Sequence, residues 1–257
     1  MSINKNIYTF GDGFATGHIW PEWPQILQAI LYNCTIKNCS GIGAGNEFIF
    51  SNLVGALAKD PLATYIVQWA QPDRFDKLIE DTSWDNIIRN DQIYHDNVIE
   101  VGTKRWWPSS ASNNLDIRTY HNFYVQSQQA KLRSFNYIWA GGQCLKNVQH
   151  CFFGTYDFGY LTDEQRQCLD FNWAFWRPWQ GLENYSLSAE FDTTRLDEIQ
   201  PSPIVHFEWV INYVLPKINV DIDTVWLDIL KQRLYNQTWI PYNPDQNIIW
   251  DKLKERK

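Results

Sequence analysis

Apolar and polar positions follow one another along the first 70 residues as strand, turn and helix. Short runs rich in β-branched and aromatic residues predict strands at 7–10, 35–39 and 64–69. Between these runs, apolar residues recur at helical spacing and predict helices over 21–32 and 47–58. Because strands alternate with helices, the pattern predicts a parallel sheet with right-handed crossovers.

The rest of the chain is predicted to add helices and a fourth strand. The apolar run at 150–153 has the composition of a buried strand, and the other periodic segments have helical spacing. The helices are expected over 121–148, 203–218, 221–236 and 245–257.

These elements predict one α/β domain with an extension. We expect an α/β domain with a mostly parallel sheet over residues 1–218, and a C-terminal helical extension over 219–257 packed on the same domain. Polar and aromatic stretches at about 82–118 and 156–200 are expected to be insertions. After the third strand, residues 71–75 are expected to start another helical turn.

The turn after the first strand carries the candidate chemistry. It reads Gly11-Asp12-Gly13-Phe14-Ala15-Thr16-Gly17. Its glycines let the backbone approach a ligand closely. In an α/β sheet this turn lies at the carboxyl ends of the strands, where ligands bind. We therefore expect the functional site here.

The turn resembles the first motif block of the SGNH (GDSL-like) hydrolases, in which Gly-Asp-Ser follows an apolar strand and a further glycine comes four residues after the serine. The resemblance implies an SGNH-hydrolase or flavodoxin-like fold, which is a three-layer α/β/α sandwich with a mostly parallel five-stranded sheet, and an ester hydrolase site. Gly13 stands where the family has its nucleophilic serine. Because glycine has no hydroxyl group, the resemblance covers the framework of the site but not its nucleophile.

Three further stretches resemble the remaining family blocks. The resemblance makes Gly43 the glycine that donates its N–H to the oxyanion, and puts Gln71 in the place of an asparagine donor. In the last block Asp197 is present, but Gln200 occupies the position of the histidine base and cannot accept a proton at neutral pH. His206 would then be a second, auxiliary histidine.

The resemblance therefore favours a catalytically degenerate member of the SGNH hydrolases that acts as a binding or structural protein. It also suggests a bacteriophage origin. Loss of the nucleophile and of the base each removes several orders of magnitude of rate in known triads. The alternative is an active hydrolase of an acyl or acetylated-sugar ester, in which His206 works with Asp12 or Asp197 on a water nucleophile. In the simpler interpretation Asp12 caps the turn and His206 forms a hydrogen bond at a helix start.

Two nucleotide-binding interpretations fit poorly. The Gly41-x-Gly43-x-Gly45 spacing is that of a dinucleotide loop, but the next strand ends in Gln68-Trp69 rather than in an acidic residue. The Gly11–Gly17 stretch lacks the Lys-Ser/Thr of a phosphate-binding loop. We expect no cofactor.

Charge and composition limit the classes of partner that we expect. The net charge is −7, with basic residues clustered only in the final KERK, so nucleic acid is not an expected partner. No apolar run approaches about 18 residues and no secretory leader is recognised, so we expect no membrane contact and a location in the host cytoplasm or a virion. The five cysteines lack C-x-x-C spacing and predict reduced, mostly buried thiols and no metal.

Tryptophan is abundant, with 14 residues in the 257-residue chain. Most are expected in the core, but two clusters stand in polar, loop-like surroundings. Tryptophan is enriched at protein interfaces and on surfaces that stack against sugars. We expect these clusters to meet a protein partner, a carbohydrate or a second copy of the chain in a homo-oligomer. The cluster residues are Trp106, Trp107, Trp173, Trp176 and Trp179.

Overall fold

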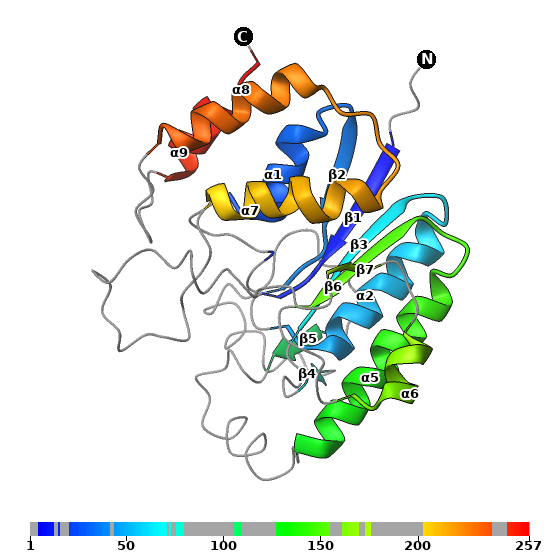
Figure 1. Ribbon diagram of the computed structural model, residues 1–257. Coiled ribbons are helices and arrows are strands. Elements are labelled where there is room, and N and C mark those ends of the chain that lie inside the picture. Colours follow the sequence, from blue (N-terminus) through cyan, green and yellow to red (C-terminus); the bar gives the residue numbers. More distant parts are fainter. Residues whose placement is uncertain are drawn as a thin grey trace.

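The computed structural model shows an α/β fold built on a parallel sheet (Figure 1), which confirms the predicted class. Adjacent strands lie in the order β2-β1-β3-β6, and all of these pairs are parallel. The strands are β1 (Lys5–Phe10), β2 (Cys34–Asn38), β3 (Thr64–Trp69) and β6 (His150–Gly154). The structure describes residues 5–12, 15, 21–41, 44–70, 72, 76–79, 105–108, 127–154, 161–169, 173–175, 203–237 and 246–256.

Three short strands lie where the sequence did not predict them. Strand β7 (Trp173–Phe175) pairs in parallel with the outer edge of β6, with a register shift, although 156–200 was expected to be an insertion. Strands β4 (Asp76–Ile79) and β5 (Arg105–Pro108) form a separate antiparallel ribbon. A helical turn was expected to begin just before β4, and irregular structure at β5. Each of these strands pairs with a segment that is distant in the sequence, and local periodicity does not reveal such pairing.

The helices predicted outside the two insertions are present, and a further short helix, α6 (Asp163–Cys168), lies within 156–200, where an insertion was expected. Helix α1 (Trp23–Ile30) begins with a capping box, in which the side chains of Glu22 and Gln25 each accept the backbone N–H of the other residue. The remaining helices are α2 (Asn46–Lys59), α5 (Ser127–Cys144), α6 (Asp163–Cys168), α7 (Pro203–Trp209), α8 (Thr224–Tyr235) and α9 (Gln246–Leu253).

Helix α7 does not continue regularly to residue 218 as the sequence pattern suggested. It passes into a π-helical turn (Val210–Val214) and then a 3₁₀ turn (Leu215–Lys217). Pro216 has no N–H, and its ring crowds the carbonyl group four residues earlier, so the regular hydrogen-bond pattern cannot extend through it. The N–H of Leu215 bonds to the carbonyl oxygen of Val210 instead.

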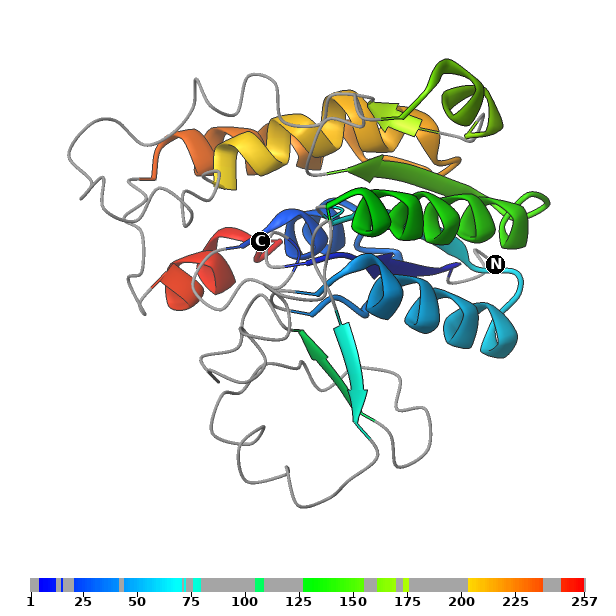
Figure 2. The ribbon, with the colours of Figure 1, turned by 90° about the horizontal axis from the view of Figure 1, so that it is seen from below.

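The two faces of the sheet bury separate hydrophobic cores. Ile7 and Ile66 point to the core shared with α1, α7, α8 and α9. Their neighbours Tyr8 and Val67 point to the opposite core, where α2 and α5 run side by side (Figure 2). Successive strand residues face opposite sides, so a continuous apolar strand such as β3 supplies both cores.

The C-terminal helices pack on the first of these cores. Trp226 of α8 and Trp250 of α9 are each 5% exposed and belong to the core with α1. The indole N–H of Trp226 donates to the carbonyl oxygen of Ala29 at 2.7 Å. Within the part of the chain that the structure describes, no helix is both long and apolar enough to cross a membrane.

The outer edge of the sheet is covered by a side chain. Gln28 of α1 accepts the N–H of Ile36 at 2.9 Å and donates to the carbonyl oxygen of Cys34 at 3.1 Å. Its amide therefore imitates the backbone of a neighbouring strand along β2. Covering an edge in this way reduces unwanted pairing with other chains.

Candidate functional site

The strand order places a topological switch point between β1 and β3. The chain passes from β1 to β2 on one side of β1 and then returns to β3 on the other side. In open α/β sheets, ligands bind at the carboxyl ends of the strands at this point. The described residues at these ends are Gly11 and Asp12 after β1, and Gln68 to Ala70 at the end of β3.

A buried hydrogen-bond chain joins the two strand ends. Gln68 Nε2 donates to Asp12 Oδ1 at 2.5 Å, and Trp23 Nε1 donates to Gln68 Oε1 at 2.8 Å. All three residues have 0% exposed surface. An indole N–H can only donate, so it fixes the amide of Gln68 with its NH₂ group toward Asp12. Asp12 is thus held as an acceptor, by a residue of β3 and one of α1.

Close packing at this turn requires glycine at position 11. A Cβ atom on Gly11 would lie 2.8 Å from the Cβ atom of Ala15 and 3.0 Å from Gln68 Oε1. The backbone closes the turn, because the N–H of Ala15 donates to the carbonyl oxygen of Asp12 at 2.9 Å. The Asp12 side chain is directed to Gln68, so the residue takes part in the buried chain as well as in the turn.

A second buried amide joins α2 to the end of β3. Asn46, the first residue of α2, accepts the N–H of Ala70 at 2.8 Å and donates to the Ala70 carbonyl oxygen at 3.0 Å. The side chain therefore satisfies both polar groups of a residue that has just left the sheet. This contact positions the start of α2 beside the switch point.

Replacing Asn46 with alanine tests this contact. We expect Asn46→Ala to lower the free energy of unfolding by about 2 kcal/mol, because two buried backbone groups lose their partners. Urea unfolding followed by circular dichroism measures the change. The exposed Asn136 on α5 provides the control: Asn136→Ala should change stability by less than about 0.7 kcal/mol, and upward, because alanine is the better helix former. Equal effects of the two substitutions would contradict the assigned role of Asn46.

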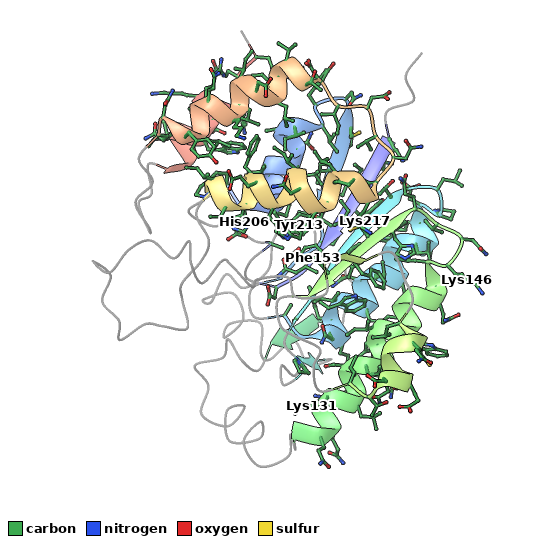
Figure 3. All side chains as sticks on the ribbon, viewed as in Figure 1. Lys131, Lys146, Phe153, His206, Tyr213 and Lys217 are labelled. Carbon is green, nitrogen blue, oxygen red and sulfur yellow. The ribbon has the colours of Figure 1, made fainter. Side chains whose placement is uncertain are left out.

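His206 lies near the start of α7 (Figure 3) and is completely buried. Burial removes the solvation of the charged imidazolium and lowers the pKa of His206 to about 3. The imidazole is therefore neutral and only weakly basic at neutral pH. His150, at the start of β6, also has its pKa lowered by burial, but it lies at the opposite end of the strands from the switch point.

Aromatic contacts connect α7 to the buried chain. The rings of Trp209 and Trp23 meet edge to face, with centroids 6.2 Å apart, and Phe153 of β6 contacts both rings. Trp23 in turn donates to Gln68. Trp23 therefore connects the packing of α7 to the hydrogen-bond chain that holds Asp12.

Part of the predicted site lies outside the described residues, namely Gly13, Gly43, Gln71, Asp197 and Gln200. Of the two tryptophan clusters, Trp176 and Trp179 also lie outside them. Trp106 and Trp107 belong to β5 and Trp173 to β7, but their side chains are not described. The structure therefore locates Asp12 and His206 from the predicted set.

Sequence reasoning missed Trp23, Asn46 and Gln68 as members of the site. A signal existed for Gln68, since a lone amide in the otherwise apolar run TYIVQW must find a partner if that strand is buried. The identity of that partner depends on the strand order.

The described residues do not suggest a metal centre. No group of three or more histidine, cysteine, aspartate or glutamate side chains within them is arranged to hold a metal ion. The five cysteines are free thiols; Cys34, Cys39 and Cys151 are buried, while Cys144 and Cys168 are exposed. Burial raises the pKa of Cys39 to about 12, so this thiol is unreactive.

Comparison with known proteins finds no match: no family model fits the chain, and neither a curated protein nor a solved structure is similar to it. The relationship to the SGNH hydrolases therefore remains a prediction from the motif blocks.

Proposed function

We propose that this chain is a catalytically degenerate protein of SGNH-hydrolase type, with a five-stranded, three-layer α/β/α core, and that it works as a binding or structural accessory protein. The motif blocks contain Gly13 where the nucleophile is required and Gln200 where the base is required. Neither residue can perform those steps. A bacteriophage origin, as a virion component or an accessory protein, belongs to the proposal and rests on the resemblance alone.

The burial of His206 carries the proposal. Because position 200 is a glutamine, the match to the last motif block makes His206 the histidine that would have to replace the missing base. A general base must reach the proton that it removes, and it works best when its pKa lies near the working pH. His206 has no exposed surface and a pKa of about 3, which favours a structural role for it.

An esterase assay tests the proposal. The unaltered protein is expected to hydrolyse p-nitrophenyl acetate no faster than the same protein unfolded in urea, because accessible nucleophiles react slowly in both. The Gly13→Ser/Gln200→His double variant is expected to gain a saturable rate, since it restores the two missing groups. Saturable hydrolysis by the unaltered protein that disappears in His206→Ala would overturn the proposal.

A second candidate function is favoured by the geometry of Asp12. A buried carboxylate held as an acceptor at a switch point is suited to orienting a catalytic histidine, as the aspartate of a catalytic triad does. The corresponding enzyme would hydrolyse an acyl or acetylated-sugar ester through a water nucleophile. The ester hydrolysis of such an enzyme should be lost in Asp12→Asn. A binding protein would show no ester hydrolysis in either form.

The tryptophan clusters supply the proposed binding surface, for a protein, a carbohydrate or a second copy of the chain. Light scattering after gel filtration distinguishes the last case. An assembly that becomes monomeric in Trp106→Ala/Trp107→Ala would support a role in self-association, and a monomer at all concentrations would exclude that role.

A further inference from the structure

A pocket of about 580 Å³ has a lining that includes none of the residues of the Asp12–Gln68–Trp23 chain. Its walls come from α1, from β2 at the edge of the sheet and from the C-terminal α9 segment, so it joins parts of the chain more than 200 residues apart. About half of the lining is apolar. These apolar and aromatic residues are Pro24, Ala29, Tyr32, Ile36 and Trp250.

The polar lining is rich in hydrogen-bond donors. The side-chain oxygen of Gln25 accepts the N–H of Glu22, and that of Gln28 accepts the N–H of Ile36. Asn38 Oδ1 accepts the N–H of Ser40. A backbone N–H can only donate, so it fixes which end of each amide is the oxygen. All three amides of the lining therefore have their oxygens engaged within the protein, and among the described residues Gln25 keeps its whole NH₂ group for the pocket.

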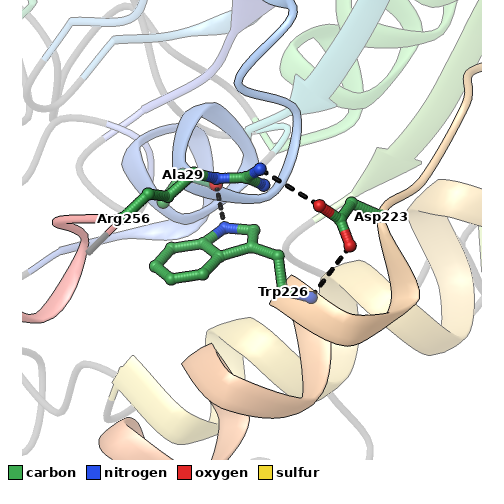
Figure 4. A network of polar contacts seen from close by, with 4 residues as sticks. All are labelled: Ala29, Asp223, Trp226 and Arg256. Atoms are coloured by element: carbon green, nitrogen blue, oxygen red, sulfur yellow. Dashed lines mark hydrogen bonds and ion pairs between the residues drawn. The ribbon is translucent and has the colours of Figure 1, made fainter.

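Arg256 adds a preorganised cation to this lining. Its guanidinium carbon lies 3.5 Å from the ring centroid of Tyr32 and 4.6 Å from that of Trp226. Nη1 donates to Asp223 Oδ2 at 3.1 Å (Figure 4), and Asp223 also accepts the backbone N–H of Trp226. An arginine has five N–H donors, so this arrangement leaves others for a ligand while holding the plane of the group in place.

The charged side chains of the pocket lining form ion pairs within the protein. Lys254 pairs with Asp251 at 2.6 Å, and both side chains are largely exposed, so the pair contributes little to stability and can rearrange. Arg256 pairs with Asp223. The pocket therefore selects through directed N–H groups rather than through excess positive charge.

We infer that this pocket binds a small organic anion, a carboxylate or phosphate group attached to an apolar planar body. The anionic oxygens would accept from Arg256 and from the amide NH₂ of Gln25, and the planar body would lie against Tyr32 and the apolar wall. Charge-assisted hydrogen bonds to arginine are among the strongest that a protein forms with such oxygens. The inference is independent of the function proposed above, since the lining of the pocket shares no residue with the proposed site and the inference involves no hydrolysis.

Ligand-observed NMR titration of the full chain tests the inference. Benzoate and phenyl phosphate are the probes for the two anions, and benzyl alcohol is the uncharged control. At least one anion should bind saturably, with a Kd on the order of 1 mM, and at least about tenfold more tightly than benzyl alcohol. Comparing the two anions shows which group the pocket prefers. No saturation up to about 20 mM, or equal affinity for benzyl alcohol, would overturn the inference.

Two variants locate the binding. Gln25→Glu keeps the capping box, in which glutamate is as favourable as glutamine, but it brings a negative charge to the pocket. It should fold normally and weaken anion binding at least about tenfold, as should Arg256→Gln. Lys231→Gln removes an exposed cation from α8, outside the lining, and should change the affinity less than about twofold. Unchanged affinity in Gln25→Glu would show that the anion binds elsewhere and would refute the inference.

Discussion

Gln68→Leu is expected to destabilise the protein by about 3 kcal/mol at pH 7. The substitution removes the amide that donates to Asp12 and accepts from Trp23, so a carboxylate and an indole N–H lose a partner at a site with no exposed surface. Leucine is no smaller than glutamine, so the cost comes from the lost polar contacts rather than from a cavity. Urea unfolding monitored by tryptophan fluorescence measures the effect.

The matched control for this experiment is Gln143→Leu, at an exposed position of α5, which should change the free energy of unfolding by less than about 0.5 kcal/mol. A double-mutant cycle adds a second check. In the Asp12→Asn background, Gln68→Leu should cost less than it does alone, because the buried group that it leaves behind is then neutral. Additive effects would mean that Asp12 and Gln68 are not coupled, contrary to the geometry.

His206 is expected to make the protein less stable as the pH falls below neutral. In the unfolded chain His206 binds a proton below its ordinary pKa of 6.5, but in the folded protein its pKa is about 3. The stabilisation is therefore complete above pH 6.5 and is lost progressively as the pH falls toward 3. The loss is close to 1.4 kcal/mol for each pH unit, or about 2.8 kcal/mol at pH 4.5.

The variant His206→Leu isolates this effect. It should lose about 2.8 kcal/mol less stability than the unaltered protein between pH 7 and pH 4.5, because leucine has no proton to bind. Phe207→Leu, a substitution at the adjacent buried position, should lower the free energy of unfolding by a similar amount at both pH values. His150 contributes in the same direction in every variant, so it cancels from the comparison. Identical pH dependence with and without His206 would show that the imidazole is solvated in the folded protein.

The buried position of His206 also changes the interpretation of the motif blocks. From sequence, a histidine shortly after Asp197 suggests a catalytic or auxiliary role. In the structure this histidine is completely buried, and Trp209, one turn further along α7, contacts Trp23. The same enclosure that lowers its pKa separates it from solvent, which is why we favour binding over catalysis.

Local pattern was sufficient for most elements of the fold. Strand β3 was predicted with its observed boundaries because a short continuous apolar run is typical of a strand buried on both faces. Helices α1 and α2 were predicted within two residues because their apolar residues recur at helical spacing. The pattern also located the Gly11-Asp12 turn at the carboxyl end of the first strand. What the pattern could not supply was the ribbon of β4 and β5, since strand pairing depends on residues far apart in the sequence.

By itself, the sequence determined the α/β class, the order of its main elements and the turn around which a site would form. Only the tertiary structure decided what surrounds each functional side chain. Asp12 is held by a residue 56 positions away, and the pKa of His206 is lowered by its burial in the folded protein. Periodicity records which face of a segment is buried, whereas hydrogen bonding and desolvation arise from the neighbours that folding brings to that face.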